Sequence, residues 1–161
     1  MHDQEFSGDR LALLEQFRQW AASSSSLVEL EKKMVEALAG RLPHYSWAGF
    51  YMLDPGDPTM LVLGPFVGAP TPHVRIPVTE GICGAAVATG ETVIVDDVAA
   101  DLRYLACSLE TRSEIVVPIY AHGRVVGEID IDSHDAAAFA EEDRKFLEAA
   151  ACLVGDFIER H

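Results

Sequence analysis

Basic residues are scarce in this chain of 161 amino acids. It contains three lysines, and its formal net charge is -14 at pH 7. Nucleic acids and anionic membranes are bound by basic surfaces, so neither is expected as a partner. The chain has no run of about 18 apolar residues and no basic-then-apolar leader. The sequence therefore predicts a cytoplasmic protein without a membrane span.

Cysteine is also sparse, with Cys83, Cys107 and Cys152 as the three examples. A small, odd number of cysteines does not build a structural disulfide framework. No Cys-x-x-Cys is present, which excludes a zinc ribbon and a thioredoxin motif. The histidines show no metal-ligand spacing, so no metal site is expected. Cys152 lies among alanines of a predicted helix, and we expect it to pack in the core.

The spacing of apolar residues predicts one α+β domain over residues 1–161, with residues 1–8 as a flexible tail. Long helices are predicted over 9–22, 27–42 and 139–158, and a short one over 81–89. Strands are predicted over 46–53, 60–66, 73–77, 93–95, 115–120 and 125–132. Ser26 and Glu29 match a capping box. We expect a layered fold in which the N- and C-terminal helices pack together on one face of a central antiparallel sheet.

Three carboxylates are predicted to meet at one end of a β-hairpin. The strands 115–120 and 125–132 flank a His122-Gly123 turn. Strand period is two, so Asp130 and Asp132 point to the same face. Glu114 begins the first strand, and the antiparallel second strand ends beside it. Repulsion among three such charges must be relieved by a cation, a shared proton or a ligand's amino group.

Each of these residues also has a purely structural interpretation. Asp130 could lie on a solvated face of the sheet, and Glu114 could bond to backbone where the strand begins. Cys83 occupies an apolar helical stretch, where a buried core thiol is common. Cys107 lies in a polar loop, where chemistry is a more natural role than packing.

Seven short segments carry a resemblance to a known family. They are Trp47-Ala48-Gly49-Phe50-Tyr51, Leu63-Gly64-Pro65-Phe66, Val74-Arg75-Ile76-Pro77, Gly81-Ile82-Cys83-Gly84, Ala106-Cys107, Ser113-Glu114-Ile115-Val116-Val117-Pro118 and Asp130-Ile131-Asp132-Ser133. Their order and spacing between about residues 46 and 146 resemble the GAF-domain free methionine-(R)-sulfoxide reductases. The resemblance implies a GAF-like fold and a thioredoxin-dependent enzyme, without a bound cofactor, that reduces the R-sulfoxide of free methionine.

The resemblance also implies roles for individual residues. The catalytic cysteine of the family falls on Cys107, and its second motif cysteine falls on Cys83. The substrate-binding carboxylates and the aromatic wall of the substrate pocket fall on Glu114, Asp130, Asp132, Trp47 and Tyr51. One position departs from the pattern, because many members carry a resolving cysteine where this chain has His73. Either Cys83 or an external thiol must then resolve the oxidised Cys107.

Reduction of a sulfoxide by a thiol requires an attacking thiolate and an acid that protonates the departing oxygen. Among three crowded carboxyls, one is expected to have a raised pKa and to serve as that acid. Glu114 and Asp132 are the candidates. The remaining carboxylates would bind the ammonium of the free amino acid, which a residue within a peptide lacks.

Two other functions compete with this one. The first is a sensory GAF module that binds a small ligand without turnover, although the chain has no Asn for a cyclic-nucleotide motif. The second is a degenerate reductase, inactivated by the change at His73. The apolar stripes of the terminal helices are compatible with a homodimer, and the loop over residues 96–111 is long enough for a lid.

Overall fold

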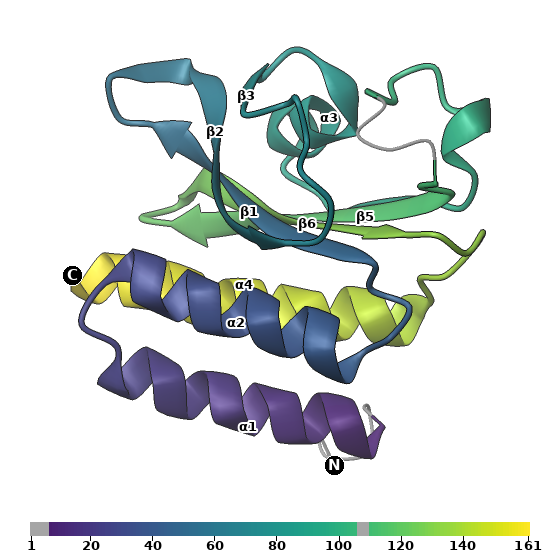
Figure 1. The fold of residues 1–161 in the computed structure, drawn as a ribbon. Coiled ribbons are helices and arrows are strands. Elements are labelled where there is room, and N and C mark those ends of the chain that lie inside the picture. Colours follow the sequence, from purple (N-terminus) through teal and green to yellow (C-terminus); the bar gives the residue numbers. More distant parts are fainter. Residues whose placement is uncertain (1–6, 106–109) are drawn as a thin grey trace.

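A six-stranded antiparallel sheet forms the centre of the protein (Figure 1). The computed structural model describes residues 7–105 and 110–161. The strands are β1 (Trp47–Asp54), β2 (Asp57–Val67), β3 (Arg75–Pro77), β4 (Val93–Val95), β5 (Ser113–Ala121) and β6 (Arg124–Ser133). They lie in the order β3-β2-β1-β6-β5-β4, so the hairpin β5–β6 is joined to the first hairpin through β1.

Helices cover both faces of this sheet. They are α1 (Gly8–Ser23), α2 (Leu27–Arg41), α3 (Gly81–Thr89) and α4 (Glu141–Arg160), with a single 3-10 turn, η2 (Val98–Ala100). Figure 1 shows α2 and α4 against one face, α1 beneath those two helices, and α3 on the opposite face. The predicted α+β architecture is confirmed, with one refinement: α1 packs on α2 and α4 as an outer layer.

Two hydrophobic cores lie on opposite faces of the sheet, and successive side chains of β6 point alternately to one face and to the other. Ile129 and Ile131 point to the helical layer, where they join a large cluster that includes Phe50 and Phe146. The smaller cluster lies under α3 and includes Trp47, Tyr51, Ile82, Cys83 and Val116. Because strand period is two, the acidic residues between the isoleucines must face this smaller core. The fold therefore buries the acids of β6 between the sheet and α3.

Local signals in the sequence account for most element boundaries. The β5–β6 turn has His122 at φ 53° and Gly123 at φ 77°, a pair of left-handed residues that suits a two-residue hairpin. Gly90, at φ 69°, ends α3 as predicted. Ser26 Oγ accepts from the backbone N–H of Glu29 at 3.2 Å. In a capping box, the side chain of Glu29 would accept from the N–H of Ser26. It accepts from the N–H of Ser25 instead, at 2.6 Å.

Three predictions need correction. β2 begins at Asp57 and is longer than the strand predicted over 60–66. β3 begins at Arg75 and is shorter than the strand predicted over 73–77. Cys152 is exposed on α4, and its predicted core packing is wrong. It lies two residues beyond the buried Ala150, which turns it away from the apolar stripe of the helix. The tail predicted over 1–8 falls mostly outside the described residues, and α1 already begins at Gly8.

Within residues 7–105 and 110–161, every helix is too short or too polar to cross a lipid bilayer.

Candidate active site

Strand β6 presents a row of three carboxyls to the space beneath α3. Glu128, Asp130 and Asp132 alternate with Gly127, Ile129 and Ile131 along the strand, and their exposed fractions are 0%, 2% and 2%. Their cross-strand neighbours on β1 are, in the same order, Tyr51, Gly49 and Trp47. The interpretation of Asp130 as a solvated strand residue is therefore wrong.

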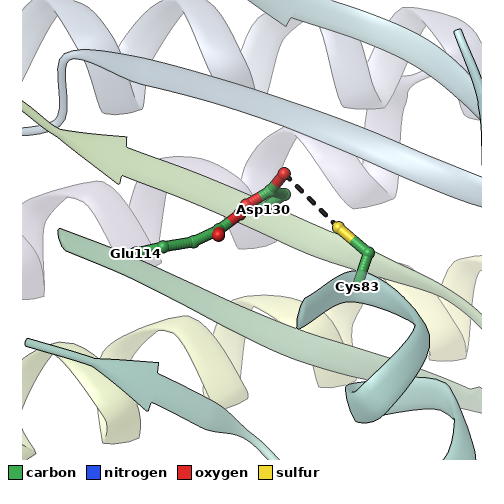
Figure 2. A group of neighbouring side chains, drawn as sticks. All are labelled: Cys83, Glu114 and Asp130. Atoms are coloured by element: carbon green, nitrogen blue, oxygen red, sulfur yellow. Dashed lines mark hydrogen bonds between the residues drawn. The ribbon is translucent and has the colours of Figure 1, made fainter. Parts of the chain in front are cut away.

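A fourth carboxyl and a thiol complete the cluster. Glu114 lies on β5 directly across from Asp132, and it is 4% exposed. Cys83 enters from α3, and its Sγ hydrogen-bonds to Oδ2 of Asp130 at 3.5 Å. One donor atom each from Cys83, Glu114 and Asp130 lies within 4.8 Å of the others, and Figure 2 shows the three side chains converging. The structure thus brings together the carboxyls that the hairpin pattern predicted.

Burial raises the pKa of the carboxyls in this cluster, so they keep their protons at pH values where exposed carboxyls are ionised. Desolvation, followed by repulsion from Asp130 and Asp132, raises the pKa of Glu114 well above its usual range. Desolvation also raises the pKa of Asp130 and of Asp132, while hydrogen bonds from Glu114 oppose the shift in both aspartates. The cluster therefore favours protonated carboxyls, and Glu114 is the member whose pKa both neighbouring aspartates raise further.

The thiol of Cys83 is also held in its protonated form. It is 5% exposed, and desolvation raises its pKa well above the usual range, with further contributions from Asp130, Glu128 and Glu114. The thiolate is the nucleophilic form of cysteine. In this environment Cys83 is a weak nucleophile.

An aromatic wall stands beside the acids. The rings of Trp47 and Tyr51 stack with their centroids 6.3 Å apart, and Phe66 stacks on the other side of Trp47 at 5.5 Å. The indole N–H of Trp47 donates to the carbonyl of Ala69 at 3.0 Å. The hydroxyl of Tyr51 donates to the backbone oxygen of His73 at 2.7 Å. Both rings are held in place by their polar ends and offer an apolar surface to a ligand.

Two small cavities border the cluster. The inner one has a volume of about 10 Å³, and its lining includes Tyr51, Cys83, Glu114 and Asp130. The outer one, of about 70 Å³, lies between Trp47 and Asp132 and extends to Ser46, Thr111 and His134. A wider cavity of about 490 Å³ lies between α4 and β5, away from the buried acids. The described residues predicted for the site therefore line these two small spaces, with Tyr51, Cys83, Glu114 and Asp130 at the inner one and Trp47 and Asp132 at the outer one.

Cys107, the predicted nucleophile, lies outside the described residues. So does part of the predicted lid over 96–111, whose described portion contains η2 and Asp97, which accepts from the N–H of Ala99 at 3.1 Å. Both roles stay predictions.

Glu128 is the site residue that sequence reasoning missed. It obeys the same alternation as Asp130 and Asp132, so the pattern Gly-Glu-Ile-Asp-Ile-Asp was the signal that could have identified it. Desolvation raises the pKa of Glu128 well above its usual range. The site thus contains four buried carboxyls where the sequence analysis expected three.

Comparison with known proteins supports the same family. The family model described as "GAF domain" matches residues 24–159. The chain is 37% identical to the free methionine-R-sulfoxide reductase of Escherichia coli, covering 91% of this chain and 85% of that protein. It is 44% identical to the Saccharomyces cerevisiae enzyme of the same name, over 68% of this chain and 61% of the relative. Its fold matches the structure of the Neisseria meningitidis enzyme in complex with its substrate at a TM-score of 0.88 and 36% identity, covering 93% of this chain and 88% of that one. The chain belongs to the GAF-domain family and, within it, to the free methionine-R-sulfoxide reductases.

Proposed function

We propose that this protein reduces free methionine-(R)-sulfoxide to methionine, with thioredoxin as the source of electrons. The observation that carries the proposal is the burial of Glu114, Asp130 and Asp132 without an ion pair to any cationic side chain in the described parts of the chain. Every ion pair of the described residues involves other carboxylates. A ligand that brings its own ammonium group supplies the missing charge.

The chemical step assigns the nucleophile to Cys107. Its thiolate attacks the sulfoxide sulfur to form a sulfur–sulfur bond while the sulfoxide oxygen takes up one proton. The sulfur–oxygen and sulfur–sulfur bonds then break as this hydroxyl passes to the cysteine sulfur, which leaves the cysteine as a sulfenic acid. Methionine is released as the thioether. The methionine sulfur is reduced by two electrons, and the cysteine sulfur is oxidised by two.

Glu114 is the acid that we assign to protonation of the oxygen. Its pKa is raised because it is buried beside two other carboxyls, and its one carboxyl hydrogen has both Asp130 and Asp132 as possible acceptors. Contact with Glu114 opposes the rise in the pKa of Asp130 and of Asp132, which suits these two carboxyls to bind the substrate's ammonium. Of the two candidates that the sequence left open, these contacts favour Glu114 over Asp132 as the acid.

The sulfenic acid must be resolved by a second thiol before it is oxidised further. Cys83 and an external thiol are the two candidates, since His73 replaces the usual resolving cysteine. The burial of Cys83 and its raised pKa oppose attack by its thiolate. These properties favour an external thiol, such as that of thioredoxin, as the resolving group.

The test is a thioredoxin and thioredoxin reductase assay that follows NADPH oxidation with separate R- and S-sulfoxides of free methionine, and with the R-sulfoxide inside a peptide. We expect turnover of the free R-isomer, loss of that turnover in Cys107→Ser, and no change in the control Cys152→Ser. Unchanged turnover in Cys83→Ser would support the external thiol. If wild-type protein binds the free R-sulfoxide but forms no methionine, it is a binding module or a degenerate reductase and the proposal fails.

A further inference from the structure

Glu128 has no task in the reaction proposed above. Its side chain is fully buried, neither carboxyl oxygen accepts a hydrogen bond of ordinary geometry among the described residues, and contact with the Cys83 thiol offsets only part of the effect of burial. A buried carboxyl that lacks full hydrogen bonding destabilises the folded state. Such a group in a stable fold points to a partner that occupies the site at some stage.

The carboxyl of Glu128 faces the same thiol as the acids of the active site. Burial raises the pKa of Cys83 first, and the charges of Asp130 and Glu128 are the next contributions. The thiol has one hydrogen to donate, and it directs that hydrogen to Asp130. Cys83 therefore lies between two carboxyls with one hydrogen for both, so neither carboxyl is fully satisfied.

We propose that Cys83, Glu114, Asp130 and Glu128 form a binding site for one thiophilic divalent cation of the Zn²⁺ class. The first three already offer donor atoms within 4.8 Å of one another, on three different elements of the fold (Figure 2). Glu128 lies outside this group of three, but it contacts Cys83 and stands on the same face of β6 as Asp130, so it is the carboxyl that would become the fourth ligand.

The geometry and the donor types fit such an ion. Donors about 2.0 to 2.3 Å from a tetrahedral Zn²⁺ stand about 3.3 to 3.8 Å apart, so Cys83 and Asp130 are already at the required separation of 3.5 Å. Glu114, whose donor atom lies within 4.8 Å of the other two, needs to close by about 1 Å. The inner cavity, of about 10 Å³, offers room for about one small ion.

The same donor set argues against the hard cations. Mg²⁺ and Ca²⁺ take six or more oxygen ligands, whereas this site offers one sulfur and three carboxyls. Thiolate and carboxylate together suit Zn²⁺, Co²⁺ and Cd²⁺. Binding releases the thiol proton of Cys83, and those of the protonated carboxyls, to solvent.

A cation in this position would exclude the substrate. It neutralises Glu114 and Asp130, which the proposed function assigns to proton donation and to the ammonium group. Binding of the metal and of free methionine sulfoxide should therefore be mutually exclusive, and this consequence alone rests on the proposed function.

The test measures metal binding without relying on activity. Reduced, metal-free Cys107→Ser/Cys152→Ser protein has Cys83 as its single thiol, so titration with Co²⁺ reports a thiolate-to-cobalt charge-transfer band from that residue alone. We expect one equivalent of Co²⁺ to bind, and Zn²⁺ to displace it with loss of the band. No band at millimolar Co²⁺ would overturn the proposal.

Further variants identify the carboxyl ligands in the same background. Glu128→Gln is expected to weaken Co²⁺ binding by about 10- to 100-fold. The control Glu31→Gln removes another buried carboxyl, on α2, and should leave the affinity unchanged. Circular dichroism of each variant verifies folding. If neither Glu128→Gln nor Asp130→Asn changes the Co²⁺ affinity, the cation binds Cys83 without the acids, and the proposed site is wrong.

Competition separates this inference from the proposed function. We expect free methionine to weaken Co²⁺ binding when it is present in excess. If Co²⁺ binds as described and methionine has no effect, the metal site stands and the assignment of the acids to the substrate ammonium fails.

Discussion

The clearest quantitative prediction concerns Glu31, a buried carboxyl outside the active site. It is 2% exposed on α2, and its Oε2 has no hydrogen-bond partner among the described residues. Its Oε1 lies over Gly64 of β2, 3.7 Å from the point where a Cβ atom would stand. Desolvation raises the pKa of Glu31 from 4.5 to about 8. We predict that Glu31→Gln stabilises the protein, and more strongly as the pH rises.

The sign follows from proton binding in the two states. Between pH 4.5 and 8 the unfolded chain releases the proton of Glu31 while the folded protein retains it, so the folded state loses stability as the pH rises through this window. The loss amounts to about 3 kcal/mol at pH 7 and to less than about 1 kcal/mol at pH 5. Glutamine resembles the protonated acid in shape and avoids that loss.

The measurement is urea or thermal unfolding of Glu31→Gln and wild type at pH 5, 6, 7 and 8. At pH 7 the melting temperature of the variant should exceed that of wild type by about 6 to 12 °C. Glu36→Gln, on the exposed face of the same helix, is the matched control and should show no such trend. A stability difference that stays constant from pH 5 to pH 8 would refute the reasoning about buried, unpaired carboxyls.

Two further predictions concern the framework and the wall of the site. Tyr45→Phe removes a buried hydrogen bond to Asp143, so we expect a loss of about 1.5 to 3 kcal/mol in the free energy of unfolding, measured in urea, with kcat unchanged. Gly84→Ala places a Cβ atom 2.9 Å from the backbone oxygen of Val78. It should displace α3 and destabilise the protein by about 1 to 3 kcal/mol, with a higher KM in steady-state assays. A Gly84→Ala variant with wild-type stability and KM would contradict the close packing of α3.

The order of helices and strands could be predicted from the sequence because most elements carry local signals. The apolar run of β5, the alternation in β6, the turn at His122 and Gly90 after α3 are local patterns, and each predicted a strand, a turn or the end of a helix. The convergence of Glu114 with Asp132 also followed from strand period and antiparallel pairing.

The burial of individual polar residues could not be predicted in this way, because it depends on which element covers each face. Both faces of β6 are covered, and an acidic face on a buried strand has the same pattern as a solvated one. Glu128 was missed for this reason. Glu31 is adjacent in sequence to two lysines, yet α2 turns it inward onto β2. Tertiary packing, which local patterns do not encode, decides such cases.

The central claim is that buried acids of β5 and β6 recognise the ammonium group of a free amino acid. The most direct measurement compares kcat/KM for free methionine-(R)-sulfoxide with that for its N-acetyl derivative, which keeps the sulfoxide and lacks the charge. The methyl ester, which keeps the ammonium, is the matched control. Loss of a partner for a buried charge costs about 2 to 5 kcal/mol, so we predict at least about a 30-fold lower kcat/KM for the N-acetyl compound. Equal kcat/KM values for the free and N-acetyl substrates would contradict the account.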